Sequence, residues 1–108
     1  MTVLRSIVLA TALSLVILVA DQATAADNER GAQLAAMCAS CHRLAGRDKA
    51  IPSIAGMDKQ KLADAMAAYK SGARSNSIMH AVALQLGDAE IATLAEYLAE
   101  RPKESKMR

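Results

Sequence analysis

The 108-residue sequence has no tryptophan or phenylalanine, and its aromatic side chains are two tyrosines. Nucleic-acid surfaces combine basic residues with stacking aromatic rings, so this shortage counts against nucleic acid as a partner. Cysteine and histidine are scarce too, with two residues of each. A structural zinc site needs four ligands. The Cys and His residues available as ligands are Cys38, Cys41, His42 and His80. Because Cys41 and His42 are adjacent, they fit poorly into one tetrahedron, which counts against zinc.

One long uncharged apolar run occurs, at residues 6–20, between Arg5 and Asp21. Its length falls short of the roughly 20 residues that span a bilayer as a helix. The small residues Ala-Thr-Ala follow at positions 23–25, as a signal peptidase requires. Together these features predict a secretory signal peptide at residues 1–25 and a periplasmic protein with no stable membrane insertion after cleavage. The alternative is an uncleaved membrane anchor.

Cleavage after position 25 leaves residues 26–108, a single domain of 83 residues that is rich in alanine. A domain of that size is near the limit at which a hydrophobic core stabilises itself unaided. We therefore expect a disulfide, a metal or a large covalent cofactor to complete it.

Charge is uneven along the chain: residues 43–74 hold seven basic and three acidic residues, and residues 75–100 hold four acidic residues and no Lys or Arg. We interpret these charges as ordinary solvated faces, and the alternative is a charge dipole that orients the protein against a partner.

Four segments have apolar residues at helical spacing, and none has sustained strand alternation, which predicts a small all-α fold of about four helices. The four stripes are Gly31, Leu34, Ala35 and Cys38; Leu62, Ala65, Met66 and Tyr69; Met79, Val82, Ala83 and Leu86; and Ile91, Leu94, Ala95 and Leu98.

Helix boundaries are marked by residues that cap or break helices. Asp58 is placed to cap the second helix and Gly72 to stop it. Gly87 is expected to end the third helix, and Pro102 to stop the fourth. A loop of residues 43–57 separates the first helix from the second.

The pentapeptide CASCH at residues 38–42 has the C-x-x-C-H pattern of c-type haem attachment. Two cysteines three apart on a helical turn, Cys38 and Cys41, can add across the two vinyl groups of one porphyrin edge. His42 is then carried beneath the iron as its proximal ligand. A porphyrin also supplies the apolar bulk that the missing aromatic side chains do not.

Other uses of the two cysteines are less consistent with the sequence. A thioredoxin-like C-x-x-C needs strand patterns that are absent here. A disulfide closing so small a ring constrains the unfolded chain little. The predicted export signal favours haem, because bacterial c-type haem is attached outside the cytoplasm.

Met79 is the preferred candidate for the sixth ligand of the iron, because it follows a polar loop long enough to wrap under the ring. Met57, in the loop of residues 43–57, is the alternative. Met66 lies on an apolar stripe, where methionine usually fills a core. His80 is a further candidate, since bis-His ligation would lower the potential that Met with His raises. More often, a histidine beside a ligand is exposed.

Pro52 has two interpretations. A ligating imidazole normally donates its other N–H to a carbonyl or carboxylate. The loop at Ile51 and Pro52 follows His42 at a suitable distance to supply that carbonyl. The alternative is a simple turn proline.

With these features the chain resembles a class I cytochrome c over the whole of residues 26–108. The resemblance implies that Gly31 and Leu34 cross Leu94 and Tyr97, with the small glycine allowing close approach. Arg43 departs from the pattern, since many relatives have glycine directly after the histidine.

A narrower resemblance is carried by the strings IPSIAG, AMAAYKSGAR, SNSIM and DAEIATLAEYLA. They are similar to the cytochrome subunit of flavocytochrome c sulfide dehydrogenases and to single-haem relatives in periplasmic sulfur oxidation. This resemblance implies an FAD-containing flavoprotein partner and onward transfer to other periplasmic cytochromes. The chain itself would be an electron carrier and not a catalyst. The alternatives are a free soluble shuttle and a haem sensor or peroxidase-like enzyme with an open sixth site.

Overall fold

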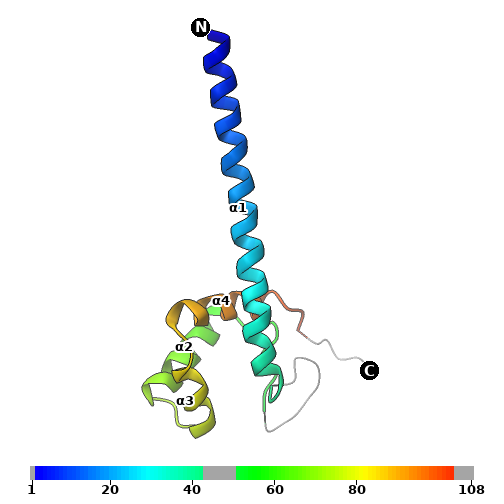
Figure 1. Ribbon diagram of the computed structural model, residues 1–108. Coiled ribbons are helices and arrows are strands. Elements are labelled where there is room, and N and C mark those ends of the chain that lie inside the picture. The colour runs from blue at the N-terminus through cyan, green and yellow to red at the C-terminus, as the bar shows by residue number, and fades with distance from the viewer. Residues whose placement is uncertain (1, 43–50, 104–108) are drawn as a thin grey trace, which may run out of the picture.

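The computed structural model describes residues 2–42 and 51–103. These residues form four α-helices and no strand: α1 (Thr2–Ala39), α2 (Lys59–Ser71), α3 (Ser77–Leu84) and α4 (Asp88–Ala99). Figure 1 shows α1 as a long rod whose C-terminal end meets the cluster of α2, α3 and α4. The prediction of an all-α fold with about four helices is confirmed.

Helix α1 runs without interruption through the predicted cleavage point after Ala25. No break in its backbone marks that point, so cleavage stays a prediction. Within the described part of the chain, no helix is both long enough and apolar enough to cross a membrane.

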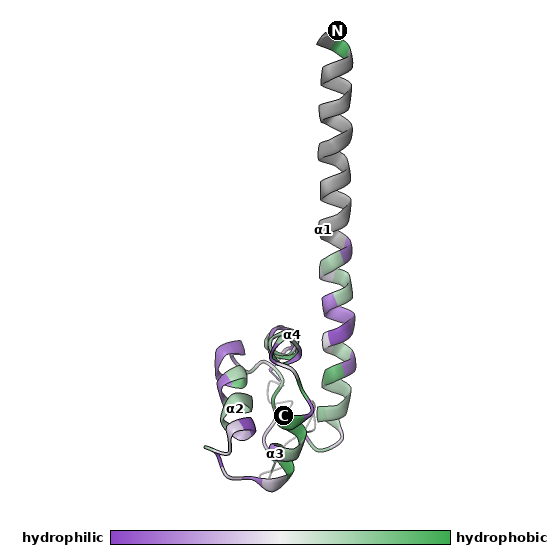
Figure 2. Cartoon of the chain, turned by 60° about the vertical axis from the view of Figure 1, so that its left-hand side comes forward, coloured by the Kyte–Doolittle hydropathy of each residue, from purple (hydrophilic) through white to green (hydrophobic). Residues whose placement is uncertain are grey.

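Helix α4 is the centre of the packing, since it contacts both α1 and α2. Figure 2 views α4 end-on between these two helices. The crossing of α1 over α4 is tight at Gly31, where an added Cβ would lie 2.5 Å from the Cβ of Tyr97. Leu34 and Leu94 are both buried beside this crossing. The crossing implied by the family resemblance is therefore present.

The residues expected to cap α2 do so. The Asp58 carboxylate accepts a hydrogen bond from the Lys61 backbone N–H at 3.0 Å, which satisfies one of the free amides of the first turn. Gly72 ends the helix with φ +81°, a left-handed conformation that glycine adopts without steric cost.

Gly87 does not end the third helix, and this expectation was wrong. Helix α3 stops at Leu84 with Gln85 as its C-cap, and Gly87 is instead the N-cap residue of α4. The Glu90 carboxylate accepts from the Gly87 backbone N–H at 3.1 Å and also pairs with Arg30 of α1. These hydrogen bonds, the one from Gly87 foremost, lower the pKa of Glu90.

Helix α4 likewise ends earlier than Pro102 would require. Its last residue is Ala99, and Glu100 is its C-cap. The four apolar residues of its predicted stripe are all buried. Only the end of the helix was misplaced, by two residues.

We predict that Gly31→Ala lowers the stability of the haem-loaded protein by about 1–3 kcal/mol, because a methyl group forced against a packed side chain strains the core. This loss opposes the gain that alanine otherwise brings to a helix interior. Thermal unfolding of the purified protein measures it. The control is Gly87→Ala, whose added methyl lies 4.0 Å from the nearest atom and should cost less. Equal stability of Gly31→Ala and the unsubstituted protein would contradict the tight crossing.

Candidate functional site

The last turn of α1 brings both cysteines and the first histidine together. Helix α1 ends at Ala39, and the backbone N–H groups of Cys41 and His42 both donate to the Cys38 carbonyl, at 3.2 and 2.8 Å. The chain therefore continues through one further tight turn. Both cysteines are free thiols, with Cys38 half-buried and Cys41 exposed. Two thiols and one imidazole thus lie on adjacent turns of the chain.

The imidazole of His42 is held by the loop that follows it. Its Nδ1 lies 2.8 Å from the carbonyl oxygen of Pro52. A carbonyl can only accept, so Nδ1 carries the proton, which in the neutral imidazole leaves the lone pair on Nε2. Neutral imidazole with a free Nε2 is the form that binds a metal. The hydrogen bond that sequence spacing suggested is therefore present.

The loop that supplies this carbonyl is fixed to the C-terminal end of α4. The Gly56 backbone N–H donates to the Leu98 carbonyl at 2.8 Å. Gly56 has φ +67°, and a Cβ there would lie 2.9 Å from the Arg101 carbonyl oxygen. Both the positive φ and the lack of room for a Cβ require glycine at this position. Residues 43–50 of the predicted loop, including Arg43, lie outside the described residues.

The two thiols have different surroundings. Burial raises the pKa of the Cys38 thiol, and its sulfur lies 3.6 Å from the Leu34 carbonyl, to which it donates. Cys41 is exposed and has the Ser40 hydroxyl 3.9 Å from its sulfur. Cys38 therefore faces the interior, while Cys41 lies at the surface of the same turn.

Met79 lies in the first turn of α3, on a different element from His42. Its backbone N–H donates to the Asn76 side chain at 2.9 Å, which caps the helix. Its side chain is partly buried and packs against the core cluster that Cys38 also contacts. Among the described helices α3 packs on α2 and not on α1. Sequence reasoning missed the Asn76 cap, although asparagine before an apolar-periodic segment is a known signal.

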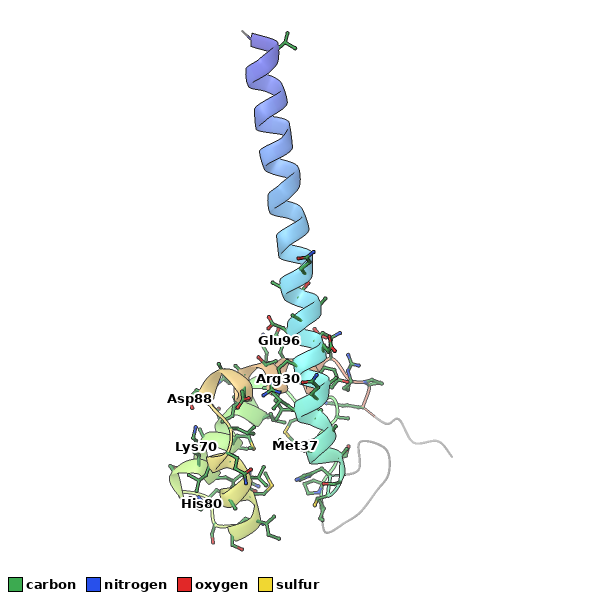
Figure 3. All side chains as sticks on the ribbon, in the orientation of Figure 1. Arg30, Met37, Lys70, His80, Asp88 and Glu96 are labelled. Carbon is green, nitrogen blue, oxygen red and sulfur yellow. The ribbon has the colours of Figure 1, made fainter. Side chains whose placement is uncertain are left out.

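The other candidates for the sixth ligand differ in burial. Met66 is buried within the core, as its apolar stripe indicated. Met57 is partly buried against the same core. Met37 is 56% exposed, and Figure 3 places it near the C-terminal end of α1.

His80 is not an exposed histidine. It is half-buried, and its Nδ1–H donates to the Tyr69 carbonyl of α2 at 2.6 Å. No spacing rule would have found this contact, because its partner is a backbone group eleven residues earlier in the chain.

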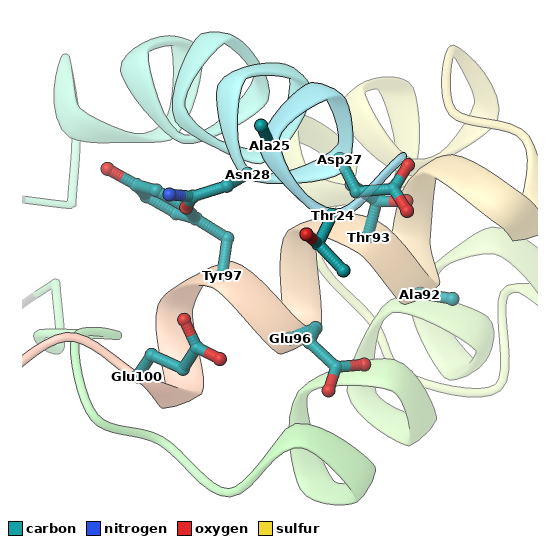
Figure 4. Close-up of a pocket in the computed structure, with 9 residues that line it drawn as sticks. All are labelled: Thr24, Ala25, Asp27, Asn28, Ala92, Thr93, Glu96, Tyr97 and Glu100. Carbon is teal, nitrogen blue, oxygen red and sulfur yellow. The ribbon is translucent and has the colours of Figure 1, made fainter. Parts of the chain in front are cut away.

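An open hollow of about 570 Å³ lies between α1 and α4, away from the CASCH turn. Figure 4 shows Thr24 and Ala25 on one side and Glu96 and Tyr97 on the other. The predicted cleavage would remove Thr24 and Ala25, so the hollow belongs to the uncleaved chain.

The donor chemistry fits haem better than a metal bound by side chains alone. In the described ranges 2–42 and 51–103, no group of three or more Cys, His, Asp or Glu side chains is placed to hold a metal ion. The turn does offer two thiols for thioether bonds and one imidazole whose Nε2 can bind iron. That set is what covalent haem requires from a protein.

Comparison with known proteins places the chain in a family. The sequence pattern of the cytochrome c family matches residues 28–101. The chain therefore belongs to the cytochrome c family, as a class I c-type cytochrome. The cofactor of the family is one covalent haem c at a motif with the spacing of Cys38 and Cys41, and its members carry electrons.

The curated relatives similar to the chain include electron acceptors of a dehydrogenase and a cytochrome c6. The thiosulfate dehydrogenase electron acceptors of Thiomonas intermedia and Stutzerimonas stutzeri are 35% and 37% identical, over 61% and 80% of this chain. The matched regions cover 32% and 44% of those two proteins, so the chain spans less than half of their length. Cytochrome c6 of a Picosynechococcus strain is 36% identical over 89% of this chain and 92% of its own.

We predict that Cys38→Ala and Cys41→Ala each leave haem attached through one remaining thioether, or prevent attachment. The pyridine haemochrome spectrum distinguishes one thioether from two, because each unreacted vinyl group shifts the band to longer wavelength. Ser40→Ala is the control, since it removes a hydroxyl from the same turn without touching either sulfur. Haem that is extracted from the unsubstituted protein by acidified solvent would contradict covalent attachment.

Proposed function

We propose that this chain is a periplasmic one-electron carrier that accepts electrons from a dehydrogenase oxidising a reduced sulfur compound. Cys38 and Cys41 would hold the haem, and His42 and Met79 would bind its iron. The observation that carries this proposal is the hydrogen bond from His42 Nδ1–H to the Pro52 carbonyl, on the same turn as two free thiols.

The bound haem supplies one-electron chemistry, between Fe(III) and Fe(II). Pro52 keeps the His42 ring oriented and raises the basicity of Nε2 through the hydrogen bond that its carbonyl accepts. Met79 with His42 gives a higher potential than two histidines would. Because His42 and Met79 would both bind the iron, no position on it would be left for a substrate, which favours electron transfer over a peroxidase-like or sensor function.

The dehydrogenase partner is supported by the relatives named as electron acceptors of thiosulfate dehydrogenase. The strings shared with flavocytochrome c sulfide dehydrogenases favour an FAD-containing flavoprotein that oxidises sulfide. The second candidate function is a free soluble shuttle between periplasmic enzymes. It is favoured by the match to cytochrome c6, which covers nearly the whole length of both chains.

The periplasmic location is supported by the features of residues 1–25. They combine Arg5, a short apolar run and an Ala-Thr-Ala site, as a signal peptide requires. Haem attachment outside the bacterial cytoplasm is consistent with the same location.

We predict that Met79→Ala opens the sixth position. Ferrous Met79→Ala should bind carbon monoxide readily, and the ferric form should lose the near-infrared band of methionine-ligated haem. The unsubstituted protein should keep the band and bind carbon monoxide poorly. Met57→Leu is the matched control, because Met57 is the alternative methionine candidate, and it should behave as the unsubstituted protein. Loss of the band in Met57→Leu would assign the ligand to Met57 instead.

We further predict that gentle purification from the native periplasm yields flavin and haem in near-equal amounts, and that sulfide then reduces the haem. Absorbance spectra with separate flavin and haem quantification measure both. Thiosulfate-driven reduction without flavin would replace the flavoprotein by a thiosulfate dehydrogenase. Haem without flavin that neither sulfur compound reduces would contradict the dehydrogenase partner and favour the free shuttle.

A further inference from the structure

We propose that His80 is a positioning residue for Met79. Its hydrogen bond to the Tyr69 carbonyl ties the first turn of α3 to the end of α2 and holds the methionine sulfur in place. This inference rests on the proposed ligation of iron by Met79.

The acceptor is a carbonyl at the end of a helix. The last four carbonyls of α2 have no partner within the helix. The Tyr69 carbonyl accepts from the Gly72 backbone N–H at 3.2 Å and from His80 Nδ1–H at 2.6 Å. His80 thus uses an acceptor that the helix leaves available, and the bond fixes its ring against α2.

The loop between α2 and α3 is fixed around the same point. The Arg74 backbone N–H donates to the Ala68 carbonyl at 3.0 Å, and its guanidinium lies 4.8 Å from the centre of the Tyr69 ring. At the end of the loop, Asn76 caps α3 by accepting from the Met79 backbone N–H. The turn that carries Met79 is therefore held from the loop side and, through His80, from α2.

The turn between α3 and α4 is also attached to α2. The Lys70 ammonium donates to the Leu86 carbonyl at 2.8 Å and lies 3.1 Å from an Asp88 carboxylate oxygen. Figure 3 shows Lys70 and His80 on the side of the molecule where α2 and α3 lie. The His80 bond therefore attaches α3 itself to α2, and the Lys70 bonds attach to α2 the turn that follows α3 and the start of α4.

Such attachment matters because α3 is short. A helix of eight residues is unstable in isolation and depends on tertiary contacts. Among the described helices, α3 packs on α2 and has no contact with α1, the helix that leads to His42. The position of the Met79 sulfur relative to the proximal side therefore depends on how firmly α3 is held to α2.

The test compares His80→Leu with His80→Asn in the haem-loaded ferric protein. Leucine removes the donor at similar size, whereas asparagine keeps an N–H donor near the position of Nδ1. At saturating imidazole, the rate of methionine displacement reports how often the iron–sulfur bond opens. We expect His80→Leu to raise this rate about three- to tenfold, the factor equivalent to losing one ordinary hydrogen bond. His80→Asn should restore most of the original rate.

A stability control separates positioning from general loosening. Ile91→Val removes one methyl group from the buried face of α4, which lowers stability without changing the bond between His80 and Tyr69, and it should leave the displacement rate unchanged. The inference is overturned if His80→Leu exchanges at the original rate, or if Ile91→Val raises the rate as much as His80→Leu does. Absence of the methionine band from the unsubstituted protein would overturn the proposed ligation itself, and this inference with it.

Discussion

The crossing of α1 over α4 at Gly31 is the constraint on which the geometry of the site depends. Because Gly31 has no side chain, α1 approaches the Tyr97 side chain closely, and this approach sets where the last turn of α1 lies. The tight turn that follows α1 carries His42. The same α4, through the Leu98 carbonyl, anchors Gly56 and so the loop that carries Pro52. Both partners of the hydrogen bond that orients the imidazole are thus placed by one helix.

The distal side is built differently. Met79 is carried by α3, which reaches the rest of the fold through α2, and α2 in turn packs on α4. The described part of α1 contacts neither α2 nor α3, although Cys38 and Met79 pack against one core cluster. The largest fully buried side chains are two leucines, Leu94 and Leu98. A core so poor in bulky side chains is consistent with a family whose haem supplies apolar surface between the two sides.

Sequence alone predicted the features that depend on local rules. The Asp58 cap, the Gly72 stop and the apolar stripe of α4 follow from chain-local geometry. The Pro52 carbonyl was also within reach of sequence reasoning, because its spacing from His42 is short. The role of Gly87 could not be predicted in this way, because the residue lies between two helices and local rules allow it either to end the first or to begin the second. Sequence could not predict the burial of His80, since its acceptor is a backbone group whose position depends on how α2 and α3 pack.

Charge shows the same limit of sequence reasoning. Summed along the chain, the basic and acidic segments suggest a strong dipole. In the fold, Lys59 and Lys70 of α2 pair with Glu96 and Asp88 of α4.

The remaining carboxylates of the acidic segment also have cationic neighbours. Glu90 pairs with Arg30, and Glu100 lies 4.0 Å from Arg101. These pairs are at the surface, and each contributes little to stability. Their effect on the field is larger, because each opposite charge at contact distance cancels most of the potential that a partner would meet. A charge sum over segments therefore overstates the steering that the described surface of this cytochrome provides.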